Sequence, residues 1–413
     1  KSLMKELSIK DSQMLVCECT NFDEKPSHWS GVFAMALCIF TLVASEFMPV
    51  SLLTPIAHSL DVTEGMAGQG IAISGAFAVF TSLFITTITN GLNRKSLLLI
   101  LTILMGVSGA VIGFANSYYT YMIGRALIGA VVGGFWSMSA AIAMRLVPKE
   151  SVSRALVIFN SGNAFAIVIA APLGAYLGTL IGWRGAFLCL IPVSFIALLW
   201  QYISLPSMPV KKQSKSMHNA LATFTLLRRP IVLLGMLSVG LFFMGQFSLY
   251  TYIRPFLETV TLVDATTLSL ILMLIGASGF AGTMLINIPL KKAFYPTLIV
   301  IPTIMAATAC GLVFVEYSVT GVTILLGIWG LVSTAAPVGW WAWIPKTFPD
   351  DAEKGGGLLV AVIQLSIALG STVGGILFDS GGLEITFLVS ALLLIISAVF
   401  TLRTAQLTPS PMK

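Results

Sequence analysis

Glu46 is an acidic residue inside a long apolar stretch of the sequence. Residues 42–57 read LVASEFMPVSLLTPIA, and the apolar run that contains them covers 32–57. Ionisable side chains in membrane-length apolar segments are rare, usually face a cavity and often form proton relays. A carboxyl group there can take up and release a proton, so Glu46 is predicted to be a proton carrier. The alternative is a protonated carboxyl group that only fixes helix packing through a hydrogen bond.

Arg125 is the one basic residue deep in an apolar stretch, at 119–144. Counted at 1.5 Å per residue, Arg125 lies roughly 10 Å and Glu46 about 15 Å below the same membrane surface, so the two are predicted to pair. Burial favours the neutral acid and a neighbouring guanidinium favours the carboxylate, so both protonation states of Glu46 stay open. The alternative is that Arg125 bonds backbone carbonyls at a helix end.

Aromatic and amide side chains in the apolar stretches could contact a solute. Amides can bond the hydroxyl groups and base edges of a neutral solute, and aromatic rings can stack on a base. The predicted contact residues are Trp136, Asn160, Asn163, Gln246, Trp340 and Gln364. The alternative for each is an ordinary packing role. Pro49 is expected to kink the helix beside Glu46, because it removes a backbone hydrogen bond.

Other kinds of chemistry have no support in the sequence. The phosphate-binding pattern G-x-x-x-x-G-K-[ST] does not occur, so direct coupling to ATP is not expected. The histidines His28, His58 and His218 are scattered, and Cys17 and Cys19 lack the further ligands that a metal site needs. We therefore expect neither an enzyme nor a protein with a metal or another cofactor.

The elements that must position these residues are membrane helices. Of the 413 residues, 57% are hydrophobic and 10% are charged, and the mean hydropathy is +0.94. Soluble domains carry about 25% charged residues, whereas a membrane-spanning helix needs roughly 20 apolar residues. The sequence predicts an all-α integral membrane protein with twelve spans, at 29–57, 66–89, 96–115, 119–144, 155–180, 184–203, 231–254, 266–289, 294–315, 320–344, 356–378 and 384–402.

The charges between the spans predict an orientation. Basic residues gather in the two tails and in the even-numbered connections, for example at Arg94, Arg145 and Lys291. Acidic residues such as Asp61, Asp264 and Asp379 lie in the odd-numbered connections or beside them. The positive-inside rule therefore places both termini in the cytoplasm. This distribution also explains the net charge of +6 without a nucleic-acid partner.

The spans divide into two similar halves. PLGAYLGTLIGWRGAF at the end of the fifth span and TVGGILFDSGGLEITF at the end of the eleventh align Gly174 with Gly374 and Gly182 with Gly382. This predicts two pseudo-symmetric six-helix bundles with a binding site between them, a plan known from transporters. The predicted parts are an N-terminal tail (1–28), a first bundle (29–203), a basic cytoplasmic linker (204–230), a second bundle (231–405) and a C-terminal tail (406–413).

Motifs in three places resemble those of the major facilitator superfamily. RALIGAVVGG, with Arg125, Gly129 and Gly133, is similar to its R-x-x-x-G-x-x-x-G motif in the fourth span. AAPLG, with Pro172 and Gly174, is similar to its antiporter motif in the fifth span. Gly129 and Gly133 are interpreted as packing positions, because small residues let membrane helices approach closely.

The third motif departs from the family pattern. GLNRK, between the second and third spans, resembles a shortened form of the family's G-x-x-x-D-R-x-G-R-R loop. Asn93 stands where an acidic residue is usual, which weakens the gating ion pair that the motif would imply.

Further segments narrow the resemblance to exporters of drugs, sugars and nucleosides. SEFMPVSLLTPIA, GGFWSMSAAIAMRLVP, LIGWR, TYIRP, PVGWWAWI and AVIQL together resemble the bacterial purine ribonucleoside efflux pumps. The resemblance implies a major facilitator fold in a bacterial inner membrane, present as a single copy. It implies export of a small polar solute, such as inosine or guanosine, by proton antiport. The alternatives are sugar or drug export and, from another class, a membrane sensor that does not transport.

Overall fold

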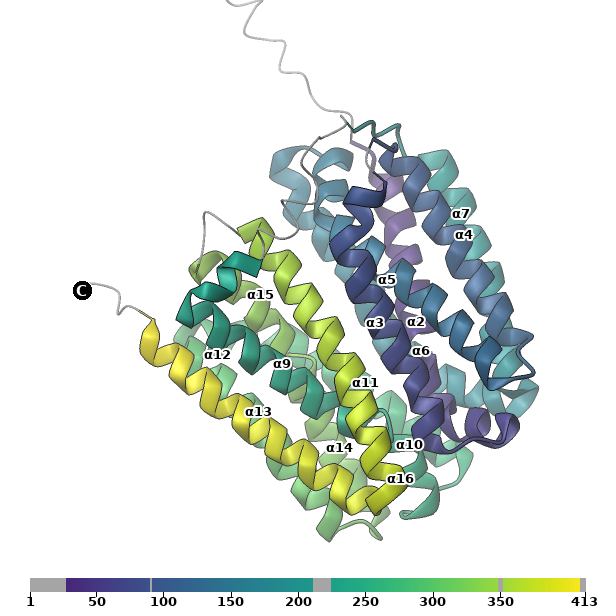
Figure 1. The fold of residues 1–413 in the computed structure, drawn as a ribbon, viewed down its shortest axis with the longest axis vertical. Coiled ribbons are helices and arrows are strands. Elements are labelled where there is room, and N and C mark those ends of the chain that lie inside the picture. Colours follow the sequence, from purple (N-terminus) through teal and green to yellow (C-terminus); the bar gives the residue numbers. More distant parts are fainter. Residues whose placement is uncertain (1–26, 90, 211–223, 348–351, 409–413) are drawn as a thin grey trace, which may run out of the picture.

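The computed structural model describes residues 27–408 except 90, 211–223 and 348–351 (Figure 1). Most of the predicted N-terminal tail, the middle of the predicted linker and the end of the predicted C-terminal tail lie outside the described residues. The described chain forms helices in two groups. The first group comprises α2 (Trp29–Leu60), α3 (Glu64–Ile88), α4 (Arg94–Gly113), α5 (Tyr118–Leu146), α6 (Val152–Leu188) and α7 (Leu190–Ser204). The second comprises α9 (Pro230–Tyr250), α10 (Ile253–Thr259), α11 (Ala265–Leu285), α12 (Asn287–Lys292), α13 (Phe294–Phe314), α14 (Val319–Ser333), α15 (Ala336–Thr347) and α16 (Ala352–Leu407).

Helix α6 and helix α16 each bend at a glycine. Gly182 has φ 75° and ψ 165°, and Gly382 has φ 78° and ψ −172°. Only glycine adopts this region of backbone space readily. The described residues contain ten helical stretches that are long and apolar enough to cross a membrane, and two of them, of 51 and 53 residues, contain these bends. Counting each bent stretch as two spans gives the predicted twelve. The bends fall at positions that the internal repeat pairs with each other.

Several helices begin at a residue that caps them. In each case a side-chain oxygen accepts a backbone N–H of the first turn, which would otherwise have no partner. The capping residues are Thr63, Asn93, Ser117, Asp264 and Ser318. Polar residues at the ends of apolar runs therefore fix where the spans start.

The two groups lie side by side and meet more closely at one end (Figure 1). Contacts between them are made by α3 with α16, α6 with α11, and α2 with α10. One buried apolar cluster lies within the first group. A second is centred on the second group and includes Val50 and Ile71 of the first. A third, near the shared end, contains Met48 of α2 together with Tyr252 from the second group. Apolar side chains of the two groups thus pack together where α2 and α3 meet the second group.

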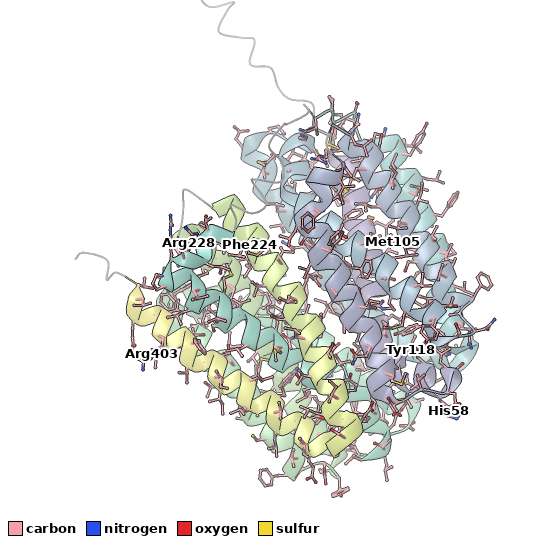
Figure 2. All side chains as sticks on the ribbon, viewed as in Figure 1. His58, Met105, Tyr118, Phe224, Arg228 and Arg403 are labelled. Carbon is pink, nitrogen blue, oxygen red and sulfur yellow. The ribbon has the colours of Figure 1, made fainter. Side chains whose placement is uncertain are left out.

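One end of the molecule carries the connections 61–63, 114–117 and 260–264. His58 and Tyr118 lie toward this end in Figure 2, and Arg228 lies toward the opposite one. We call it the outer end, after the orientation that the charge pattern predicts. It is the end at which the two groups meet.

Candidate functional site

Three charged side chains are fully buried among the described residues. Glu46, Arg125 and Arg254 expose 4%, 0% and 5% of their surface. Glu46 lies on α2, and both arginines donate hydrogen bonds to backbone carbonyls of α2 between residues 45 and 51. The buried charges of the described chain therefore converge on one segment of a single helix.

Arg125 on α5 holds two neighbouring helices through their backbones. Its Nη1 donates to the Ser45 carbonyl at 2.8 Å, and its Nη2 donates to the Glu46 carbonyl at 2.7 Å. Its Nε donates to the Gly70 carbonyl of α3 at 3.0 Å. The predicted proximity of Arg125 to Glu46 is present, but these hydrogen bonds go to carbonyls within the helices and not to the Glu46 carboxylate.

Pro49 explains why a carbonyl of α2 is free to accept from Arg125. In a helix the N–H of residue 49 would bond the carbonyl of residue 45, and proline has no N–H. Helix α2 continues through Pro49, so the buried Ser45 carbonyl loses its helical donor. Unpaired backbone groups are unfavourable in an apolar interior, and Arg125 supplies the missing donor.

The Glu46 carboxyl group lies where the two groups of helices meet. It lies near the Arg125 guanidinium of its own group and within hydrogen-bonding reach of the Gln364 side chain of α16 in the other. At the same level the rings of Phe47 on α2 and Phe247 on α9 lie 5.6 Å apart. Of the sequence-predicted residues, Gln364 is thereby brought to Glu46, whereas Gln246 is the residue before Phe247 on α9.

Four buried polar atoms on α2, α3, α9 and α16 lack partners among the described residues. They are Ser45 Oγ, Ser74 Oγ, Gln246 Oε1 and Gln364 Oε1. Ser74 belongs to the same region, because α3 passes so close to α16 that a side chain at Gly75 would meet the Gln364 carbonyl. Buried polar atoms are usually paired, so this set is suited to bonding the hydroxyl or amino groups of a polar solute.

The remaining predicted contact residues lie elsewhere in the packing. Trp340 is 2% exposed, and its ring packs edge-on against Trp343 with 5.6 Å between centroids. Trp136 is half-buried against the core of the first group. Asn163 is half-buried and Asn160 is exposed. Among the described residues, none of these four forms a hydrogen bond, an ion pair or a ring contact with Glu46.

The glycines of the two motifs lie where helices pass close together. A Cβ atom at Gly129 would meet the Ser74 carbonyl of α3, and one at Gly133 would meet the Ala78 carbonyl. At Gly174 of α6, which follows Pro172 by half a turn, it would lie 2.8 Å from Ser51 Oγ of α2. The AAPLG motif therefore packs on the same segment of α2 that the arginines contact.

Asn93 has a structural role that the sequence did not reveal. Its Oδ1 accepts the N–H groups of Lys95 and Met208, both at 3.0 Å, and its Nδ2 donates to Ser207 Oγ at 2.7 Å. Asn93 thus caps α4 and fixes the chain that follows α7. A neutral amide suits this task because it both donates and accepts.

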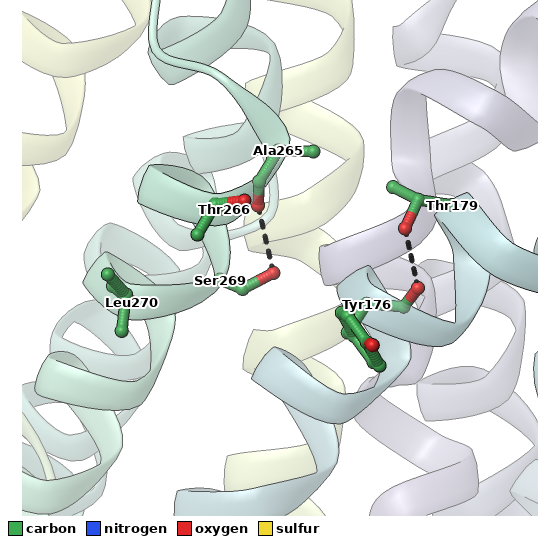
Figure 3. A pocket seen from close by; sticks show the side chains of 6 residues that line it. All are labelled: Tyr176, Thr179, Ala265, Thr266, Ser269 and Leu270. Carbon is green, nitrogen blue, oxygen red and sulfur yellow. Dashed lines mark hydrogen bonds between the residues drawn. The ribbon is translucent and has the colours of Figure 1, made fainter.

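A pocket of about 280 Å³ lies between α6 and α11 (Figure 3). It is lined by Tyr176, Thr179, Ala265, Thr266, Ser269 and Leu270. Two of its hydroxyl groups already donate to their own helices, Thr179 to the Tyr176 carbonyl and Ser269 to the Ala265 carbonyl. The lining contains neither a sequence-predicted site residue nor a charged side chain.

The chain is similar to known proteins over most of its length. The family model described as Major Facilitator Superfamily matches residues 35–354. The purine ribonucleoside efflux pump NepI of Salmonella enteritidis is 38% identical over 92% of this chain and 95% of its own. The transcription regulatory protein OpdE of Pseudomonas aeruginosa is 61% identical over 93% of this chain and 95% of its own.

Solved structures share the fold at low sequence identity. A bacterial homologue of the human lysosomal transporter Spinster, crystallised in an inward-facing and unoccupied conformation, has a TM-score of 0.74 at 14% identity, with 92% of this chain and 98% of that one covered. The D-xylose–proton symporter has a TM-score of 0.69 at 16% identity, with 90% and 95% covered.

Proposed function

The chain belongs to the major facilitator superfamily, and we propose that it exports purine ribonucleosides in exchange for protons. The observation that carries the proposal is the Glu46 site. Among the described residues Glu46 is the one acidic side chain that is fully buried, and it lies between the two groups of helices. A carrier that couples transport to protons needs a protonatable group at the central site between its halves.

Arg125 suits Glu46 for repeated proton exchange. All three carbonyls that Arg125 bonds belong to the first group of helices, so a movement between the groups leaves them intact. The positive charge therefore stays beside Glu46 throughout the cycle. When the carboxyl group releases its proton, the new negative charge is already compensated, and burial does not forbid the ionised state.

The unpaired polar atoms support a neutral polar cargo. Ser45, Ser74, Gln246 and Gln364 offer hydroxyl and amide groups but no fixed charge. They can bond ribose hydroxyls and the edge of a purine base. The similarity to NepI favours purine ribonucleosides within this chemistry. A sugar could use the same groups, so sugar export is the alternative within the family.

Transport in proteoliposomes tests both parts of the proposal. Wild-type protein should exchange labelled inosine for internal inosine, and a pH gradient should drive inosine uphill. Glu46→Gln should keep exchange and lose uphill transport, because the amide keeps the shape of the side chain and cannot release a proton. Glu384→Gln, which changes an exposed acid on α16, is the matched control and should retain both. Uphill transport at the wild-type rate by Glu46→Gln would refute the coupling role.

Exchange rates of different solutes, and of tryptophan variants, test which solute is transported. Inosine and guanosine should exchange faster than arabinose or a hydrophobic cation. Trp136→Ala should slow nucleoside exchange more than Trp341→Ala, which changes a ring that is 45% exposed. Trp340→Ala should also slow it if the packed Trp340 ring turns toward the site during the cycle. Exchange of arabinose without inosine would favour the sugar alternative.

A sensing role is the second candidate. The name of the 61% identical relative describes a transcription regulatory protein. A protein that senses a solute would bind inosine to the Glu46 site without moving it. Saturable inosine binding in detergent, together with no exchange in proteoliposomes, would favour this role over export.

We also propose that the protein spans a bacterial inner membrane as a single copy with both termini in the cytoplasm. The proposal extends to the two six-helix bundles, with bounds at 29–203 and 231–405. The charge pattern supports it. His58→Cys should react with an impermeant thiol reagent from outside intact cells, and Arg403→Cys should react only after lysis. The reverse pattern would invert the orientation.

A further inference from the structure

Arg254 joins the two groups of helices at the outer end. It lies on the short helix α10, and its side chain is almost wholly buried. Its Nη1 donates to the Ser51 carbonyl of α2, in the other group. Its Nε donates to Glu258 Oε1 on its own helix at 2.7 Å. The guanidinium therefore has one partner that moves with it and one that belongs to the opposite half.

The Ser51 carbonyl is available because of Pro55. A residue with an N–H at position 55 would bond the carbonyl of residue 51, and Pro55 has none. Ser51 is fully buried, so water does not replace the missing donor in this conformation. The bond from Arg254 is thus the means by which this carbonyl is paired while the outer end is closed.

A second contact between the groups lies close to the first. Asp379 of α16 accepts from Thr63 Oγ1 at 2.6 Å and from the Gly65 N–H at 3.1 Å, at the start of α3. Gly65 has no side chain at a point where a Cβ atom would meet the Asp379 carboxylate. In Figure 1 α3 and α16 come together at this end.

We propose that Arg254 is a latch that holds the outer end closed through the carbonyl that Pro55 leaves unpaired, and that each transport cycle breaks and remakes this bond. The inference rests on the proposed transport function, in which the two groups rock about the central site. Opening the outer end separates α10 from α2 and admits water, which then pairs the Ser51 carbonyl. Glu258 stays with Arg254 and keeps its charge compensated. The hydrogen bond from Arg254 to Ser51 is therefore strong while water is excluded, and it can break once water enters.

Distance measurements between spin labels test the latch directly. His58 on α2 and Leu262 after α10 are both exposed at the outer end and belong to different groups. With the five cysteines replaced by serine, labels at His58→Cys and Leu262→Cys report whether that end is open. Arg254→Ala should raise the open fraction about 10-fold, as expected for the loss of one buried charge-assisted hydrogen bond.

Arg184→Ala is the matched control. Arg184 is another outer-end arginine that donates to a backbone carbonyl, that of Ala115 at 2.7 Å, and it also donates to Ser59 Oγ at 2.9 Å. Both partners lie in its own group, so its loss should leave the open fraction unchanged. An equal rise in Arg184→Ala and Arg254→Ala, or no rise in a folded Arg254→Ala, would overturn the latch.

Pro55→Ala separates the latch from a general loss of stability. The alanine restores the N–H that bonds the Ser51 carbonyl within α2. This carbonyl then has a donor whether or not Arg254 bonds it, so closure is stabilised less although the Arg254 side chain is present. The open fraction should rise in the same direction and by less than in Arg254→Ala. An unchanged fraction would contradict the proposed role of the proline. The distances are measured without inosine and do not depend on the identity of the solute. If the protein does not transport nucleosides but Arg254→Ala still opens the outer end, the proposed substrate is wrong and the latch stands.

Discussion

Helix α2 contains two proline sites that look alike in sequence and differ in their partners. Pro49 frees the Ser45 carbonyl, and Pro55 frees the Ser51 carbonyl. An arginine donates to each of them. Arg125 comes from the same group of helices as α2, whereas Arg254 comes from the other group. The first bond can last through a rocking movement, and the second cannot.

The same arrangement, an arginine bonded to a carbonyl that a proline leaves free, can serve two purposes. A proline-freed carbonyl is a fixed acceptor that needs no polar side chain in the apolar helix. Bonded from within its group at Ser45, it holds a positive charge permanently beside Glu46. Bonded from across the interface at Ser51, it marks the closed conformation. The outcome depends only on which group supplies the arginine.

The largest expected effect is on transport by Arg125→Ala. This change leaves the buried Ser45 carbonyl without a donor, at about 1–3 kcal/mol. It also removes the bonds to the Glu46 and Gly70 carbonyls and the cation beside Glu46. Uphill inosine export should fall by about 100-fold or more, against about 10-fold for Arg254→Ala, which affects one carbonyl. Initial rates at matched protein levels, over a range of external pH, provide the measurement. Equal losses in the two variants would remove the distinction between a permanent and a transient bond.

The second prediction concerns the coupling of each proline with its arginine. Pro49→Ala restores an N–H for the Ser45 carbonyl, so it should offset part of the stability lost in Arg125→Ala. Pro55→Ala should do the same for Arg254→Ala. We expect coupling energies of about 1 kcal/mol in thermal unfolding of the detergent-solubilised protein.

The mismatched pairs are the controls for this cycle. Pro49→Ala with Arg254→Ala, and Pro55→Ala with Arg125→Ala, share no carbonyl and should be additive within about 0.5 kcal/mol. Coupling of similar size in matched and mismatched pairs would show that the prolines act on the whole helix and not on single carbonyls.

A third prediction compares the two halves at their bends. Gly182→Ala and Gly382→Ala place a side chain in a backbone conformation that costs about 1–3 kcal/mol. In neither case would the new Cβ atom meet another atom within 4 Å, so the backbone alone is tested. Gly357→Ala is the control, since it also has open space and an ordinary helical backbone. Thermal unfolding should show similar losses at both bends and none at Gly357.

Much of the fold followed from patterns within the sequence. Apolar length marks the spans, and the internal repeat pairs Gly182 with Gly382, which adopt the same backbone conformation. The depths counted along two apolar stretches predict that Arg125 lies near Glu46. Each of these inferences uses spacing along one chain segment, and membrane helices convert such spacing into position with little ambiguity.

The partners of the arginines could not be predicted in the same way. The prolines identify Ser45 and Ser51 as free carbonyls, a signal that residue spacing does contain. Which donor reaches each of them depends on how helices from distant parts of the chain are placed. The same limit applies to Trp340, whose packing against Trp343 depends on the rotation of α15.

The smallest expected effect separates the two contacts of the outer end. The bond from Arg254 to Ser51 is buried, whereas the Asp379 carboxylate is exposed and water competes for it. Exposed polar contacts contribute about 0–1 kcal/mol. Asp379→Asn should therefore raise the open fraction of the spin-labelled protein only about 2-fold, and added salt should weaken the wild-type contact in the same sense. Asp61→Asn, at the end of α2, is the control and should have no effect. If Asp379→Asn opened the outer end as far as Arg254→Ala does, the exposed cap on α3 would carry as much of the closure as the buried carbonyl. The bond to the Ser51 carbonyl would then not be the main contact that holds the outer end closed.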